Sequence, residues 1–309
     1  MNFETLTIED VKSLYEKKII SFLELIEMQV NHIRNVEKDI LSLVNFDEEL
    51  YLQKAKNYDT QSKVRGTLEN IPFGVKDLID IKGMKTEANS KSLKGNISEK
   101  DSTVVTRLKN AGAFVSMKTN THEYAYGAVS PPTRNPWDFS KIPGGSSGGS
   151  AAATSSGIVL GSLGSDTAGS IREPAALCSV VGFKPTYNWI PLSGVVPLAW
   201  TLDVVGPITK TISDCAIVFG ALSENYQNID IKKVENKHKI GILEEYFAPM
   251  EQQVSDSYNE SITMLERIVT FNKVYSWNID EVISTIFVIL TAESAAFLDK
   301  KITHNPDSF

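Results

Sequence analysis

The chain has 309 residues, which at about 150 residues per domain allows one large domain or two ordinary ones. Apolar residues make up 42% of it and charged residues 22%, ordinary values for a globular protein that exclude a wholly disordered chain. The net charge of −7, and the lack of any basic run interleaved with aromatic residues, disfavour nucleic acid as a direct ligand.

The N-terminal residues 1–18 alternate apolar and charged side chains and lack the apolar core of a secretory signal. We therefore expect a cytoplasmic protein. The two cysteines, Cys178 and Cys215, are too few for a disulfide framework or a four-ligand zinc site. Both are expected to be reduced and structural.

Residues 1–60 are predicted to form a helical layer. Thr7 with Asp10, and Ser21 with Glu24, have the spacing of a capping box, and each pair precedes apolar residues at intervals of three and four. Residues 71–76 then predict a short apolar strand. That strand ends in Lys76, where the pattern predicts another buried residue.

From Ser102 the pattern predicts a helix closed by Gly112, then a strand over 113–118, which is the alternation typical of α/β folds. Further strand-like segments lie at 158–163, 180–184, 239–243 with a helix after it, and 273–277. Residues 282–298 are apolar but contain Glu293 and several small polar residues, so they predict a buried helix and no membrane span.

Residues 141–170 hold eight glycines and eight serines, with Lys141 and Asp166 as the only charged residues. Apolar stretches at 151–153 and 158–160 argue against a flexible linker. The segment GGSSGGS at 144–150 lacks the ending of a phosphate-binding loop. It also lacks the preceding strand that a serine nucleophile elbow requires, because Pro136 and Pro143 interrupt the residues before it.

The four histidines, His32, His122, His238 and His304, occupy settings typical of solvated or core side chains. An activated serine in this chain is therefore expected to use another base. A buried lysine whose pKa is lowered toward neutrality can supply a free amine at working pH, and Lys76 fits that requirement.

Two parts of the sequence resemble motifs of a known family. GGSSGGSAAA, followed by GSLGSDTAGSIREPAALCSVVGFKPT, closely resembles the amidase signature, and Ser146 and Ser170 stand 24 positions apart as in that family. Gly74-Val75-Lys76-Asp77 resembles its catalytic lysine motif. The resemblance covers roughly residues 60–222 and is weaker on either side. It implies an α/β fold whose mixed β-sheet core is covered by helices on both faces, as one domain with residues 1–60 as the helical layer and 61–309 as the core.

The resemblance also implies the site residues. Ser170 would be the nucleophile, and Ser146, after a cis peptide bond, would relay its proton to the neutral amine of Lys76. The backbone N–H groups of Thr167, Ala168, Gly169 and Ser170 would face the oxyanion. Ser147 would support the network, Asp166 and Arg172 would brace the loop as a charged pair, and Cys178 would be structural. Gly145, Gly148 and Gly149 are expected to accept unusual backbone angles.

Two features depart from the family pattern. Ala168 stands where glycine is frequent, and the loop 126–133 is shorter than usual, which predicts a wider or differently shaped substrate pocket. Family domains usually continue well over a hundred residues past the point that corresponds to Phe309, so we expect the core to be incomplete at its C-terminus.

The resemblance therefore implies an amidase that converts a carboxylic acid amide to a carboxylate and ammonia or an amine through a Ser-Ser-Lys acyl-enzyme, with no metal and no cofactor. An alternative is the glutaminase subunit of a glutamyl-tRNA(Gln) amidotransferase, which feeds ammonia to a partner subunit. The loop 126–133 and residues 190–194 favour a stand-alone amidase. A truncated, catalytically idle fragment is the alternative of another class. We expect a small-molecule amide as substrate and no nucleic acid or membrane partner, and leave a homodimer open.

Overall fold

The computed structural model describes residues 2–61, 66–223, 239–243, 250–274, 278–304 and 306–308. It divides the chain into two compact units, Met1–Ile229 with Ala292–Phe309, and Asp230–Thr291. The sequence predicts one domain, and the structure differs because the second unit pairs its strands with each other. There β7 (Lys239–Ile242) runs parallel to β8 (Thr270–Lys273), with α8 (Gln252–Leu265) between them in the chain.

The predicted helical layer is present in the first unit. It comprises η1 (Phe3–Thr5), α1 (Ile8–Glu16), α2 (Phe22–Ile40) and α3 (Glu48–Gln61). Both predicted capping boxes form, at Thr7 for α1 and at Ser21 for α2. The helices start where the sequence predicts because these side chains satisfy backbone N–H groups that have no partner within the helix.

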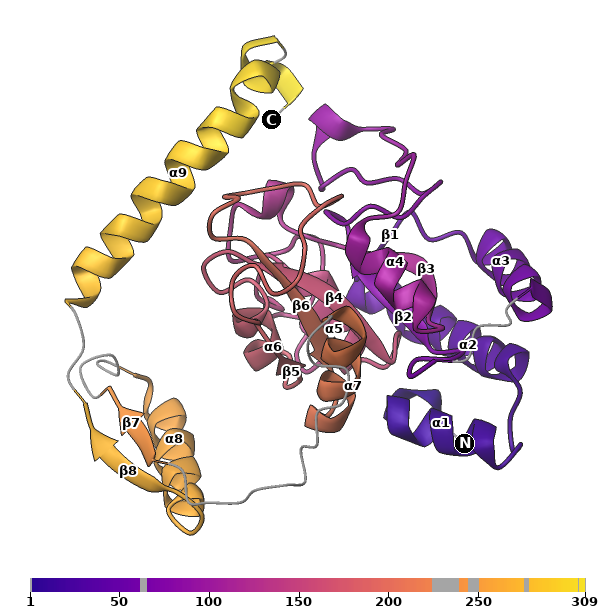
Figure 1. Ribbon diagram of the computed structural model, residues 1–309, viewed down its shortest axis with the longest axis horizontal. Helices are drawn as coiled ribbons and strands as arrows, with labels where there is room; N and C mark the ends of the chain where they lie inside the picture. The colour runs from indigo at the N-terminus through magenta and orange to yellow at the C-terminus, as the bar shows by residue number, and fades with distance from the viewer. Residues whose placement is uncertain are drawn as a thin grey trace. The chain divides into compact units, whose positions relative to one another are not determined.

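A six-stranded mixed sheet forms the centre of the first unit (Figure 1). Its strands, in the spatial order β1-β3-β2-β4-β6-β5, are β1 (Leu43–Val44), β3 (Phe114–Thr119), β2 (Pro72–Lys76), β4 (Gly161–Asp166), β6 (Val204–Thr209) and β5 (Val181–Gly182). β2 runs parallel to both β3 and β4, whereas β1, β6 and β5 pair antiparallel. The end of β2 is therefore enclosed by neighbours on both sides.

Helices cover both faces of this sheet, as expected. Besides the N-terminal layer they are α4 (Thr103–Asn110), α5 (Gly148–Ser155), α6 (Arg172–Leu177) and α7 (Ile212–Leu222). The short η2 (Lys91–Leu93) precedes α4, and η3 (Glu123–Ala125) precedes α5. Apolar residues of α1, α4 and α7 gather in one buried cluster, and those of α2, α3 and α5 mainly in a second. A sheet buried on both faces explains why β2, β3 and β4 contain no exposed residue.

Some predicted boundaries are wrong. β4 starts at Gly161 and not at 158, and β8 ends at Lys273, where the predicted strand 273–277 begins. Residues 275–277 and His238 lie outside the described residues. β6 was not predicted, because Gly206 and Pro207 sit inside it. Pro207 lies opposite Leu163 of β4, beyond the two residues of β6 that pair with β5.

The prediction of a buried helix over 282–298 is wrong. α9 (Ile279–His304), followed by η5 (Pro306–Ser308), leaves Phe287 59% and Val288 67% exposed. Within the described residues it is the one helix long and apolar enough to cross a membrane, a property that core helices share. Glu293 of α9 accepts hydrogen bonds from the backbone N–H and hydroxyl of Thr201, at 3.0 and 2.6 Å, within the first unit.

One fold contact is tested by removing the carboxylate of Asp214. This buried side chain of α7 accepts the backbone N–H groups of Ile8 and Glu9, at 3.2 and 3.1 Å, and so joins α7 to the start of α1. Because Asp214→Ala leaves these donors without acceptors, we expect the free energy of unfolding to fall by about 1–3 kcal/mol. Urea denaturation measures this, with the exposed Asp256→Ala as control. Equal losses in the two variants would contradict the assignment.

Candidate active site

Lys76 is the last residue of β2, and its side chain is fully buried. Its Nζ donates to Ser146 Oγ at 2.7 Å and to Ser165 Oγ at 2.9 Å, with the Ser165 carbonyl oxygen at 3.4 Å. The sheet is tight here, since a Cβ on Gly74 would lie 3.1 Å from the Thr119 side chain. The amine is thus surrounded by neutral oxygen atoms.

Burial lowers the pKa of Lys76 to about 7, and the attraction of Asp166 and Asp203 acts in the opposite direction. A desolvated amine favours its neutral form. At neutral pH a large fraction of Lys76 therefore has a lone pair that can accept a proton from the Ser146 hydroxyl. This is the state that a general base requires.

Ser146 follows a cis peptide bond with Gly145 and is fully buried. Its carbonyl oxygen accepts the His122 N–H at 3.1 Å and the Ser130 hydroxyl at 3.0 Å. Gly145, Gly148 and Gly149 are not among the glycines with positive φ. Close packing requires them: a Cβ on Gly145 would lie 2.5 Å from Val129 N.

Ser147, beside Ser146, forms three hydrogen bonds with Ser165 and Ser170. Its hydroxyl donates to the Ser165 carbonyl oxygen at 3.1 Å, and the Ser165 N–H donates back to that hydroxyl at 3.3 Å. Its backbone N–H donates to the Ser170 carbonyl oxygen at 3.1 Å. Ser147 thus joins the loop of Ser146 to β4 and to the segment that carries Ser170.

Ser170 is half-buried, just after Gly169, which has a φ of +136°. Its hydroxyl forms no hydrogen bond with any residue that the structure describes. The structure therefore brings Lys76 and Ser146 into direct contact, whereas no hydrogen bond joins Ser146 to Ser170. In the absence of substrate such links are often long, and the exposed part of Ser170 leaves its hydroxyl free to react.

Asp166 and Arg172 form the expected charged pair, with Nη2 and Oδ1 2.9 Å apart. Asp166 also accepts the backbone N–H groups of Gly169 and Ile171, at 2.8 and 3.1 Å. Burial alone would raise the pKa of Asp166, but its hydrogen bonds and the charge of Arg172 hold it below the usual value. This carboxylate fixes the loop around Ser170.

The hydrogen bond from Gly169 to Asp166 shows that one of the expected oxyanion donors is wrong. The Gly169 N–H is already donated to Asp166, so it is not free for a ligand. The N–H groups of Thr167, Ala168 and Ser170 form no hydrogen bond within the described part of the chain. These three N–H groups remain as candidate donors.

Two residues of the site were not predicted from the sequence. Ser165 contacts the Lys76 amine directly. It is one of several small residues in the glycine-rich strand β4, so the local sequence gives no sign of that role. Asp203 accepts the Thr167 hydroxyl at 2.5 Å and the Leu198 N–H at 2.9 Å. Burial raises the pKa of Asp203. It comes from a distant loop, so local spacing could not reveal it.

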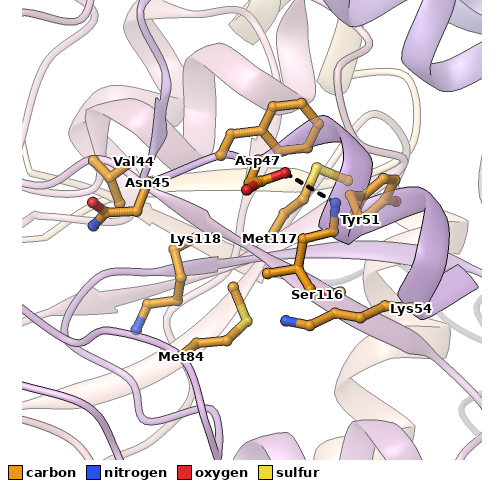
Figure 2. A pocket seen from close by; sticks show the side chains of 11 residues that line it. Val44, Asn45, Asp47, Tyr51, Lys54, Met84, Ser116, Met117 and Lys118 are labelled. Carbon is orange, nitrogen blue, oxygen red and sulfur yellow. Dashed lines mark hydrogen bonds between the residues drawn. The ribbon is translucent and has the colours of Figure 1, made fainter.

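A pocket lies elsewhere, between the start of α3 and the sheet (Figure 2). Its lining includes Lys54, Met84, Ser116 and Lys118 but none of Lys76, Ser146 and Ser170. Both cysteines are buried thiols without a disulfide, as expected, and burial raises the pKa of Cys178 to about 12. Over the described ranges, no cluster of three or more His, Cys, Asp or Glu side chains could hold a metal ion.

The pKa of Lys76 predicts a pH dependence. With the neutral amine as the expected base and its pKa lowered to about 7, the reactivity of the Ser170 hydroxyl should rise with pH and reach half its maximum near pH 7. The rate of labelling by a serine-reactive fluorophosphonate at several pH values measures this. A rate that stays flat from pH 6 to about pH 9 and rises only near the usual lysine pKa of about 10.4 would contradict it.

Ser165→Ala removes one hydroxyl next to the Lys76 amine. The loss of a hydrogen bond of about 0.5–1.5 kcal/mol predicts labelling of Ser170 that is about threefold to tenfold slower. Ser162→Ala is the matched control, since Ser162 lies on the same strand but bonds Ser150 and Thr154. The assignment fails if both variants react at the wild-type rate.

Comparisons with known proteins identify the family of this chain. A curated relative from Caldanaerobacter subterraneus, named as the subunit designated A of Glutamyl-tRNA(Gln) amidotransferase, is 36% identical over 96% of this chain and 66% of its own length. The chain thus spans just under two thirds of that relative.

Two solved structures are also similar. A crystal structure of an amidase has a TM-score of 0.90 at 32% identity, covering 98% of this chain and 71% of its own. The corresponding Glutamyl-tRNA(Gln) amidotransferase subunit from Thermotoga maritima has a TM-score of 0.80 at 35% identity, covering 96% and 67%. The family model described as Amidase matches residues 24–308. The resemblance seen in the motifs is thereby confirmed: the chain belongs to the amidase family.

Proposed function

We propose that this chain hydrolyses a carboxylic acid amide through a covalent acyl-enzyme on Ser170. The observation that carries the proposal is the 2.7 Å contact between the buried Lys76 amine and Ser146. A buried lysine with a pKa of about 7 in contact with a serine can act as an activated base. The segment that carries Ser170 adjoins this serine loop, since the Ser147 N–H donates to the Ser170 carbonyl oxygen. Family membership supports the same reaction class.

The first half-reaction forms the acyl-enzyme. Ser170 Oγ attacks the amide carbonyl carbon, its proton passes to Ser146 Oγ, and the Ser146 proton passes to Lys76 Nζ. The tetrahedral intermediate then loses its C–N bond, and the proton returns from Lys76 through Ser146 to the leaving nitrogen. Ammonia or an amine departs, and the acyl group stays on Ser170.

The second half-reaction uses water. A water molecule attacks the acyl carbon and its proton passes through Ser146 to Lys76. The bond to Ser170 Oγ then breaks, and the proton returns from Lys76 through Ser146 to Ser170 Oγ. The products are a carboxylic acid, ionised at neutral pH, and the free Ser170 hydroxyl. In both halves the N–H groups of Thr167, Ala168 and Ser170 would stabilise the oxyanion.

We further propose that the amide is that of glutamine and that the chain works as the ammonia-producing subunit of an amidotransferase. The sequence motifs favoured a stand-alone amidase, but the name of the 36% identical relative supports this alternative better. Ammonia would then pass to a partner protein. Homodimer formation and a cytoplasmic location remain predictions.

Labelling tests the reaction class. We expect a fluorophosphonate to form one adduct, which peptide mass spectrometry maps to Ser170. Ser170→Ala should abolish the adduct and Lys76→Ala should slow it by at least about a hundredfold. The exposed-loop variant Ser140→Ala should react as the wild type. An adduct on Ser146 or Ser147 would overturn the assignment of the nucleophile.

Ammonia release tests the substrate. The wild type should release ammonia from glutamine faster than from benzamide, and Ser170→Ala should release none from either. Faster turnover of benzamide would favour the stand-alone amidase. A chain that is labelled at Ser170 but turns over neither amide would support the idle alternative.

A further inference from the structure

A second buried lysine lies behind the site. Lys118 of β3 forms an ion pair with Asp77, the residue after Lys76, with Nζ and Oδ1 3.1 Å apart. Their side chains are 1% and 2% exposed. Asp77 Oδ1 has no hydrogen-bond partner among the described residues, so the charge of Lys118 alone compensates this oxygen. The mechanism proposed above uses neither side chain.

The pair holds the turn that follows β2. Asp77 Oδ2 accepts the Glu87 N–H at 3.1 Å. The amine of Lys118 donates to the Ile79 carbonyl oxygen at 2.7 Å and to the Thr86 hydroxyl at 3.0 Å. One strand and two loop segments therefore meet at this pair.

The backbone of Asp77 is fixed as well. Its N–H donates to the Thr119 carbonyl oxygen, and its carbonyl oxygen accepts the Ala88 N–H, both at 3.0 Å. Both backbone polar groups of the residue next to Lys76 are thus hydrogen-bonded.

Stability alone does not explain the pair. Burial raises the pKa of Asp77 and lowers that of Lys118, which reports the unfavourable desolvation of both charges. Buried ion pairs can often be replaced by apolar residues without loss of stability, and their best-supported role is to fix one arrangement of the chain. Here the arrangement that they fix is the end of the strand that carries Lys76.

We propose that the Asp77–Lys118 pair positions the Lys76 amine against Ser146 and keeps water away from the end of β2. The inference rests on the proposed function, in which Lys76 is the base. Lys118 also lines the pocket of Figure 2, so a loosened pair would let water from that pocket approach the strand end. Asp77 and Lys118 are positioning residues that act through Lys76.

The proposal predicts a change in the pH dependence of Ser170 labelling. Burial is the largest cause of the low pKa of Lys76, while Asp166 and Asp203 are the charged groups that act on the amine directly. Water at the strand end would weaken the effect of burial and leave those carboxylates in place. The labelling midpoint should therefore move to higher pH.

The test uses the double variant Asp77→Asn/Lys118→Met in the full chain. It leaves no unpaired buried charge, so it should fold, as checked by circular dichroism and thermal melting. We expect fluorophosphonate labelling of Ser170 at pH 7 to be about tenfold slower or more. The labelling midpoint should lie about half a pH unit or more above that of the wild type.

Two variants serve as controls. Lys118→Arg keeps the charge and should recover more than half of the rate lost in the double variant. Lys109→Met breaks the partly exposed pair between Lys109 of α4 and Asp101, and it should leave rate and midpoint unchanged. A double variant that no longer folds, or one that keeps the wild-type rate and midpoint, assigns the pair to stability alone and overturns the proposal. Absence of labelling in the wild type would instead contradict the proposed function.

Discussion

The site depends on the burial of one amine without a counter-ion at its nitrogen. Within the described part of the chain no carboxylate lies within ion-pair distance of Lys76 Nζ, whose contacts are two serine residues. Burying an unpaired ammonium is so unfavourable that such a group gives up its proton. The mixed sheet, closed on both faces, supplies the desolvation that turns an ordinary cation into a base.

Two buried carboxylates near Lys76, those of Asp166 and Asp203, accept hydrogen bonds mainly from backbone N–H groups. Asp166 holds the loop of Ser170, and Asp203 holds Thr167. Each accepts backbone N–H groups, a typical way to order an irregular segment. A loop built this way keeps its free N–H groups in fixed directions, which is the preorganisation that an oxyanion site needs.

Much of this could be predicted from the sequence. The capping boxes located the first helices, and Lys76 stood out as a charge at the end of an apolar strand. The motif spacing selected Ser146, which contacts Lys76, whereas Ser170 as the nucleophile stays a prediction. Contacts between distant segments could not be predicted: Ser165 looks like any strand serine, and Asp203 reaches Thr167 from a loop 36 residues away. β6 could not be predicted because Gly206 and Pro207 lie inside it, and both residue types have a low propensity for strands.

The central claim is that Lys76 carries a neutral amine at working pH. Its most direct test is an NMR titration of the protein with ¹³C-labelled lysine side chains, in which the signal absent from Lys76→Met assigns the residue. We expect the Lys76 Cε resonance to titrate with a pKa of about 7. A pKa near the usual lysine value of about 10.4 would contradict the claim.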